Sequence, residues 1–279
     1  MQKHYWFSGF WSKLFYKYSE SLYGHNSKFY GDVYSELLEK NINPVAFSLK
    51  DETIEKALPF LKRQGLNEDD QFVTLHLREP GQVIEDEHHQ YRNVNPHDYL
   101  KAIDWLLESG LKIVRIGHPK MTPIPKRKGL IDLTRIPYPD EVDLYVCARA
   151  KFYYGSVSGP FSISDFFGSN LLLTNVNQYN LNRPRALVQL RPFKNSTGDI
   201  VSMRDIRAME LSSITAVEPY KKNGLKPENL TNDDHLKSVK DMISFLEGGS
   251  LVSANTKRKK ETGQAYILSS YTTDSLGLL

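Results

Sequence analysis

Between residues 71 and 175 the chain alternates short apolar runs with segments whose apolar residues recur at helical spacing. The apolar runs are QFVTLHLRE, LKIVRIGHP, GLIDLTR, AKFYYGS and NLLLTN, and the helical patterns are DYLKAIDWLLESG, DEVDLYVCAR and FSISDFFG. Short runs rich in apolar and β-branched residues are typical of strands buried inside a parallel sheet. Strands that alternate with helices are joined by right-handed crossovers. The pattern therefore predicts an α/β protein with a doubly wound, mostly parallel, Rossmann-like sheet.

The flanking segments divide the chain into three parts. Residues 1–66 are expected to form a helical extension, because FYGDVYSELLEKN and TIEKALPFLKRQG have helical spacing and end near Asn or Gly. Residues 67–249 form the predicted Rossmann-like domain, which ends in a helix over DDHLKSVKDMISFLEGG that packs back on the sheet. After Asn175 the pattern loosens, and no regular element is predicted before that last helix. Residues 250–279 are polar and lack periodicity, so a flexible tail is expected.

Composition narrows the class of function. The 36 Lys and Arg are interleaved with 33 Asp and Glu, and a formal net charge of +3 does not indicate a nucleic-acid-binding protein. Cys147 is the single cysteine, so neither a disulfide framework nor a zinc knuckle is available, and a reducing cytosol is the expected compartment. No window approaches the ~18 apolar residues of a membrane span. Aromatic residues near Lys13 and Lys17 leave peripheral contact with a membrane open, although a helix packed on the main domain is favoured.

The turn after the fourth expected strand, SVSGPFS, has the features of an anion site. It leads from a strand into a helix, whose exposed N–H groups and dipole favour a bound phosphate. Gly159 would let a ligand approach the backbone, and Pro160 suits the first helical position. The candidate contacts for a diphosphate are Ser156, Ser158, Gly159, Pro160 and Ser162. The alternative is an ordinary strand-to-helix turn with a Ser N-cap.

Three residues near the end of the first expected strand are further candidates. Arg78 lies where doubly wound sheets bind ligands, and its guanidinium could make two parallel hydrogen bonds to phosphate oxygens; alternatively, it is a surface Arg paired with Glu79 or another acid. Glu79 could act as a general base for a hydroxyl group, or it could hold Arg78 in place. His76 lies on the same strand face as Arg78, and it is either a ligand contact or a core histidine with satisfied hydrogen bonds.

Other candidates follow the remaining strands. Gly117 and His118 lie where this fold usually receives the base and ribose of a nucleotide, or else they form a plain turn. Asn175, at the end of the fifth strand, is a weaker candidate for a ligand contact. The loop EDEHHQYR offers carboxylates and imidazoles at residues 85–89, but consecutive side chains seldom converge on one ion. A solvated lid and no metal site are therefore expected there.

The segments LHLRE, GHP, DLT, YYGSVSGP and FFGSNLLLTN occur in this order, and through them residues 68–248 resemble a family of bacterial glycosyltransferases. The resemblance is to the C-terminal, donor-binding half of the GT-B fold, with related patterns in heptosyltransferases and fucosyltransferases. Arg78 looks like the Arg of the fucosyltransferase HxR motif, and Gly117 like the Gly after the second strand. Residues 158–160 look like the family's Ser-Gly-Pro turn. Val157 departs from the pattern, because heptosyltransferases often have Asp there.

The resemblance implies a metal-independent glycosyltransferase without a cofactor. It would transfer a sugar from a nucleotide-sugar donor to a glycan or lipid-linked acceptor, in bacterial surface polysaccharide or glycan synthesis. Arg78 and Glu79 are the expected catalytic residues, and a cytoplasmic location is expected, with contact at the inner face of the membrane left open.

Alternatives to that function also stay open. Residues 1–66 are too few for a second Rossmann-like domain, so they are expected to be a remnant of an acceptor domain or a substitute for it. The alternative is a non-catalytic or truncated nucleotide-sugar-binding subunit that needs a partner for the acceptor side. A homo-oligomer also stays open, as does another nucleotide-sugar enzyme such as an epimerase, since fold alone does not fix the reaction.

Overall fold

The computed structural model describes residues 47–80, 87–178, 185–212, 214–248 and 266–268. Its centre is a sheet in the strand order β3-β2-β1-β4-β5-β6-β9, in which the first six are parallel and β9 is antiparallel to β6. The strands are β1 Phe72–His76, β2 Lys112–Arg115, β3 Leu130–Asp132, β4 Phe152–Gly155, β5 Leu171–Val176, β6 Ala186–Leu190 and β9 Tyr266–Leu268. This order confirms the expected doubly wound, mostly parallel Rossmann-like sheet.

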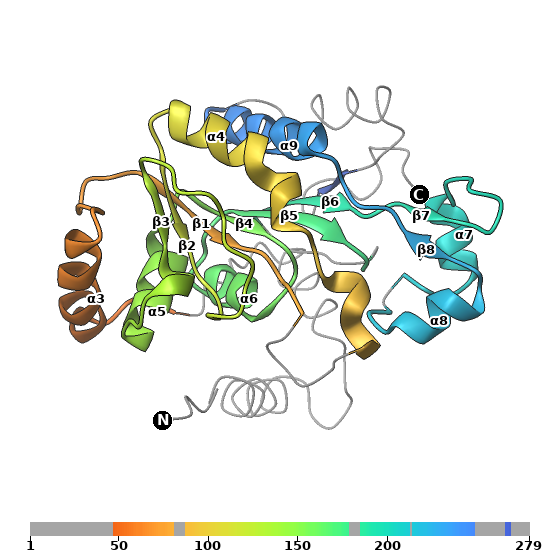
Figure 1. The fold of residues 1–279 in the computed structure, drawn as a ribbon, viewed down its shortest axis with the longest axis horizontal. Helices are drawn as coiled ribbons and strands as arrows, with labels where there is room; N and C mark the ends of the chain where they lie inside the picture. The colour runs from red at the N-terminus through yellow and green to blue at the C-terminus, as the bar shows by residue number, and fades with distance from the viewer. Residues whose placement is uncertain (1–46, 81–86, 179–184, 213, 249–265, 269–279) are drawn as a thin grey trace, which may run out of the picture.

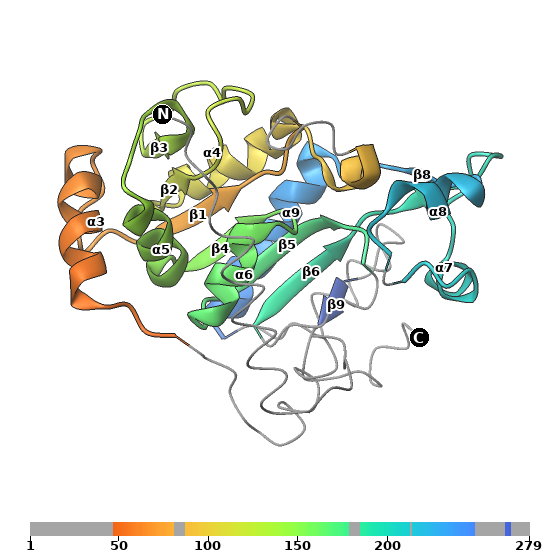
Figure 2. The same cartoon turned by 90° about the horizontal axis from the view of Figure 1, so that it is seen from below.

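Helices cover both faces of the sheet (Figures 1 and 2). On one face lie α4 (Leu100–Glu108) and α9 (Asn232–Leu246), and on the other lie α3 (Asp51–Arg63), α5 (Asp140–Arg149) and α6 (Gly159–Phe166). Every residue of β1, β4 and β5 is buried, as expected for strands covered on both faces. The helix expected at the end of the domain is confirmed as α9, which packs against α4 and β5.

The beginning of α9 shows how local sequence sets an element boundary. Thr231 precedes the helix, and its side chain accepts a hydrogen bond from the Asp234 N–H. The Asp234 carboxylate in turn accepts from the Thr231 N–H, so the two residues form a capping box.

A small lobe lies beyond β6. It consists of the two-stranded sheet of β7 (Phe193–Lys194) and β8 (Lys226–Pro227) with the short helices α7 (Met203–Ala208) and α8 (Val217–Lys222). Phe193 and Tyr220 stack at its centre, with ring centroids 4.5 Å apart. Three short 3-10 helices complete the described elements: η1 Glu87–Arg92, η2 Pro96–Tyr99 and η3 Leu133–Arg135.

The structure departs from the sequence prediction after Asn175. The segment without a predicted element contains β6, a sixth parallel strand. The sequence does not indicate this strand, because a polar residue, Gln189, is buried inside it and Arg191 is buried directly after it. These two residues break the apolar pattern that identifies a buried strand, yet both have buried hydrogen-bond partners. Within residues 250–279, where a flexible tail is expected, β9 forms an edge strand; the rest of that segment lies outside the described residues.

The N-terminal extension is described only from residue 47. The helix expected over TIEKALPFLKRQG is confirmed as α3, which packs against α5 in the core around Leu61 and Val146. The helix expected over FYGDVYSELLEKN lies outside the described residues. No helix within the described ranges is long and apolar enough to span a membrane.

Candidate functional site

The candidate site lies at the carboxyl ends of β1 and β4, which are neighbours in the sheet. The chain leaves β1 toward α4 and leaves β4 toward α6, and these helices cover opposite faces of the sheet (Figure 2). This is the topological switch point, where doubly wound sheets bind their ligands. Two turns meet here, residues 76–79 after β1 and residues 155–159 after β4.

A glycine allows the two turns to approach each other. Gly155 lies opposite His76 in the register of β1 and β4, and a Cβ atom at Gly155 would lie 1.9 Å from the His76 carbonyl oxygen. Its φ of 149° also favours glycine. The Ser156 N–H donates to the His76 carbonyl at 3.2 Å, and the Ser156 Oγ accepts from the Arg78 N–H at 2.7 Å. Ser156 therefore joins the two turns, and Gly155, which the sequence analysis did not select, makes the join sterically feasible.

Ser158 directs its hydroxyl to His76 rather than to the helix it precedes. Its Oγ lies 2.9 Å from His76 Nδ1 and 3.4 Å from the hydroxyl of Tyr153. Ser158 is the N-cap residue of α6, but its side chain makes no capping hydrogen bond. The first-turn N–H groups of this helix, such as those of Gly159 and Phe161, therefore lack a side-chain cap from Ser158. Such groups favour a bound anion.

His76 is electrically neutral at pH 7. Its side chain is buried, and this desolvation, followed by the positive charges of Arg115 and Arg78, lowers its pKa to about 4. A neutral imidazole can accept a hydrogen bond from the Ser158 hydroxyl at Nδ1, or it can donate one from Nδ1–H to Ser158 Oγ, depending on its tautomer. Of the two sequence interpretations, the geometry favours a histidine that supports the turn through Ser158.

Arg78 is held by the last residues of the long loop that follows β1. Its Nη1 donates to Asn93 Oδ1 at 3.0 Å, and its carbonyl accepts from the Val94 N–H at 2.9 Å. Nearby, Arg92 Nη2 donates to the Val157 carbonyl at 2.7 Å. Residues 91–94, the clamp segment, therefore contact both turns of the site. Arg92 and Asn93 have no sequence signature as site residues, because only the fold brings the loop to the switch point.

Glu79 pairs with Arg115, a residue that no sequence motif marks as part of a site. Its Oε1 accepts from Arg115 Nη2 at 2.9 Å, and its Oε2 accepts from the Thr122 N–H at 2.8 Å. Arg115, at the end of β2, is fully buried and also pairs with Asp132 at 3.1 Å. The network ties the ends of β1, β2 and β3 together. This geometry favours a structural role for Glu79 over both expectations, that of a general base and that of a support for Arg78.

Gly117 and His118 follow β2, one strand away from the two turns. The φ of Gly117 is 144°, and a Cβ atom there would lie 2.4 Å from Met121 Sδ. His118 is partly exposed, its Nδ1 accepts from the Lys120 N–H at 3.1 Å, and desolvation lowers its pKa.

The structure does not bring all the candidates together. Gly159 and Pro160 are the first residues of α6 and Ser162 is in its first turn, so these three belong to the switch point. The Asn175 side chain is only 4% exposed; its Nδ2 donates to the Tyr99 hydroxyl at 3.1 Å, and its Oδ1 accepts from the Leu230 N–H. It therefore supports the end of β5, two strands from β1.

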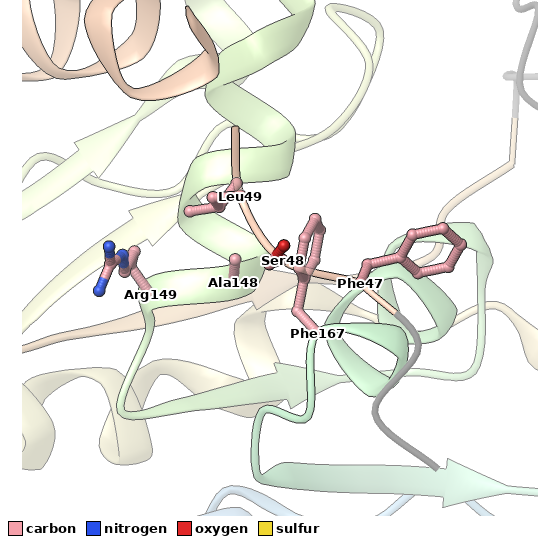
Figure 3. A pocket seen from close by; sticks show the side chains of 6 residues that line it. All are labelled: Phe47, Ser48, Leu49, Ala148, Arg149 and Phe167. Atoms are coloured by element: carbon pink, nitrogen blue, oxygen red, sulfur yellow. The ribbon is translucent and has the colours of Figure 1, made fainter. Parts of the chain in front are cut away.

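A small hollow of about 280 Å³ lies elsewhere (Figure 3). Its lining residues are Phe47, Ser48, Leu49, Ala148, Arg149 and Phe167. Ala148 and Arg149 end α5, and Phe167 follows α6, so the hollow lies toward the amino ends of the strands. It is therefore separate from the candidate site at the carboxyl ends.

The acidic and His-rich loop is only partly described. Residues 81–86 lie outside the described residues, and of residues 87–89 only the backbone, in η1, is described. Among the described residues, no three His, Cys, Asp or Glu side chains are grouped so that they could hold a metal ion.

The fold and the site define a doubly wound α/β protein with a candidate anion site at its switch point. No protein-family model matches the chain, and no curated protein matches it. Among solved structures, the chain is similar to the glycosyl transferase family 9 protein from Veillonella parvula DSM 2008, with 13% sequence identity and a TM-score of 0.42. The match covers 71% of this chain and 53% of the other, so the chain spans about half the length of that protein.

Proposed function

We propose that this protein is a glycosyltransferase that binds a nucleotide-sugar donor at the carboxyl ends of β1 and β4. The observation that carries the proposal is the turn at Ser158, whose hydroxyl lies against His76 and makes no capping hydrogen bond to α6. N–H groups at a helix N-terminus suit a diphosphate. The resemblance of residues 68–248 to glycosyltransferases supports a nucleotide sugar as the molecule that carries this diphosphate.

The chemistry of sugar transfer fits such a site. An acceptor hydroxyl oxygen attacks the anomeric carbon of the donor, the bond from that carbon to the diphosphate breaks, and the hydroxyl proton passes to a base. Negative charge grows on the leaving diphosphate, so preorganised donors accelerate the step. The N–H groups of α6 and the Arg78 guanidinium would supply them, with one Arg78 nitrogen fixed by Asn93.

The remaining candidates take roles around the diphosphate. Gly117 and His118 would contact the base or ribose, and Ser162 would contact the phosphates from the first turn of α6. Glu79, with both carboxylate oxygens engaged by Arg115 and Thr122, fits a structural role better than that of the general base. The resemblance further supports a cytoplasmic, metal-independent enzyme of surface polysaccharide or glycan synthesis with a glycan or lipid-linked acceptor.

The test is a ligand screen followed by one pair of variants. Thermal shifts with UDP, GDP, ADP, CMP and their common sugar conjugates should identify one nucleotide that stabilises the protein. Calorimetric titration should then show at least tenfold weaker binding in Arg78→Ala. The control Arg63→Ala removes an exposed guanidinium from the last turn of α3 and should bind like the wild type. No shift with any nucleotide in folded protein, or unchanged affinity in Arg78→Ala, would contradict the proposal.

A second candidate function uses the same site without catalysis. The part of the chain that the structure describes contains one Rossmann-like sheet, to which a donor would bind, and no second sheet of this type. A donor-binding subunit that needs a partner for the acceptor side would show the nucleotide-specific shift and its loss in Arg78→Ala. It would, however, transfer no sugar in an assay with glycan and lipid-linked acceptors.

A further inference from the structure

Arg191 is a buried cation beyond the candidate site. It follows β6, two strands away from β4, and its side chain is 1% exposed. Burial lowers its pKa to about 10, so it stays protonated at neutral pH. A buried guanidinium is costly unless its N–H groups find acceptors. The acceptors of Arg191 therefore indicate which part of the structure the buried guanidinium holds in place.

Arg191 donates to backbone carbonyls of the clamp segment. Its Nη1 donates to the carbonyl of Tyr91, and its Nη2 donates to the carbonyl of Asn93 at 2.9 Å. The side chain of Asn177 also donates to the Tyr91 carbonyl, at 2.9 Å. The planar guanidinium therefore spans two carbonyls that lie two residues apart, a geometry that the point charge of a Lys cannot reproduce.

The clamp segment, held by Arg191, makes hydrogen bonds to both turns of the site. Asn93 presents its backbone carbonyl to Arg191 and its side-chain oxygen to Arg78. Val94, the next residue, donates its N–H to the Arg78 carbonyl. Arg92, on the other side of Asn93, donates to the turn after β4. A continuous series of hydrogen bonds thus connects Arg191 with the residue proposed to bind the leaving diphosphate.

We propose that Arg191 is a positioning residue that fixes the clamp segment and, through Asn93, the guanidinium of Arg78. The inference rests on the proposed function for its role in binding, while the restraint itself is independent of any ligand. Arg191 is expected to affect diphosphate binding chiefly through Arg78, because the other route, from Arg92, reaches only the Val157 carbonyl ahead of α6.

The experiment compares Arg191→Lys with Arg127→Lys, a matched change at an arginine that pairs with Asp104 far from the switch point. Amide hydrogen exchange of Val94 in the unliganded protein reports whether the clamp segment stays bound to Arg78. Titrations with UDP, GDP and ADP report binding in the wild type, Arg191→Lys, Arg78→Ala and the double variant.

The proposal predicts at least tenfold faster exchange of Val94 in Arg191→Lys and no change in Arg127→Lys. Affinity for the bound diphosphate should fall at least tenfold in Arg191→Lys, with a much smaller further loss when the change is added to Arg78→Ala. Unchanged Val94 exchange in folded Arg191→Lys, or a full additional loss in the double variant, would overturn it. Faster exchange in a protein whose wild type binds none of the three diphosphates would support the restraint and refute the proposed function.

A second variant keeps the inference testable if Arg191→Lys does not fold. Asn93→Ala retains the backbone carbonyl that Arg191 binds and removes the side-chain link to Arg78. It should weaken diphosphate binding at least tenfold, without further loss in the Arg78→Ala background. Wild-type affinity in Asn93→Ala would overturn the proposed connection.

Discussion

Ser158 Oγ lies 2.9 Å from Nδ1 of His76, so the residue at the N-cap of α6 hydrogen-bonds across the switch point to β1. One hydrogen bond thus connects the strand that carries Arg78 with the helix whose N-terminus is proposed to bind phosphate. A change at the buried imidazole of His76 is therefore expected to affect the turn after β4 and the N-terminus of α6.

The first prediction concerns stability and pH. His76 keeps a pKa of about 4 in the folded protein, whereas its value in an unfolded chain is near 6.5. Between these values the unfolded state binds the extra proton, so the contribution of His76 to the free energy of unfolding is complete above about pH 6.5 and is lost as the pH falls toward 4. A difference of this size corresponds to roughly 3 kcal/mol. Urea unfolding from pH 7.5 to 4.5 should show a smaller pH dependence in His76→Gln than in the wild type, and equal dependence would contradict the neutral buried histidine.

The second prediction separates two reasons for a glycine at position 155: the close approach of the turns after β1 and β4, and a positive backbone φ. Gly155→Ala places a methyl group against the His76 carbonyl and should cost roughly 3 kcal/mol or more of unfolding free energy. Gly110→Ala is the control, because Gly110 has a φ of 84° but a Cβ atom there would meet nothing within 4 Å, and strain alone should cost about 1 kcal/mol. Denaturant midpoints measure both changes. Similar losses in the two variants would show that the turns need not approach this closely.

The third prediction concerns the buried ion pairs of Arg115. Glu79→Gln removes the more buried of the two carboxylates that pair with the fully buried guanidinium of Arg115, and only Asp132 then balances its charge, so the loss should be roughly 2–3 kcal/mol. Lys101→Met, which breaks an exposed pair with Asp233, should cost less than about 1 kcal/mol. Urea unfolding of both variants tests the contrast. A Glu79→Gln variant as stable as the Lys101→Met variant would mean that Arg115 does not depend on Glu79.

The fourth prediction uses one position to separate helix stability from anion binding. Ser158→Asp places a carboxylate at the N-cap of α6, where it should stabilise the helix by about 0.5–1 kcal/mol, yet it should repel a diphosphate and weaken binding at least tenfold. The matched comparison is Ser158→Asn, an uncharged residue of similar shape that can also cap the helix, so it should bind several-fold more tightly than the Asp variant. Calorimetry and thermal unfolding measure the two effects. Equal affinities of the Asp and Asn variants would place the anion elsewhere.

Much of the fold could be predicted, because the spacing of apolar residues and the composition of each short segment indicate which side chains are buried. The five runs from β1 to β5 and the helices between them were each visible as local patterns. The missed strand β6 shows the limit of such patterns, because Gln189 looks unsuitable for a buried strand until its partner Ser238, on α9, is known. Partners that distant in sequence are fixed only by the tertiary fold.

The candidate site was predictable in part for the same reason. Ser158 and Arg78 follow strands, and parallel strands place their carboxyl ends at one edge of the sheet. The partner of Glu79 was not predictable, because it depends on the register that places Arg115 opposite Leu75 in β1 and β2. The clamp segment was not predictable either, since its position depends on Arg191, about 100 residues further along the chain.

A donor site at the switch point can be tested directly by the response of backbone amide NMR resonances to the nucleoside diphosphate identified by the ligand screen. We expect saturable shifts of the Gly159 and Phe161 amides at the start of α6, with the resonances of Leu49 and Phe167, in the separate hollow, unchanged. Shifts confined to the hollow, or no shift at Gly159 and Phe161 while the ligand binds, would contradict a donor site at the switch point.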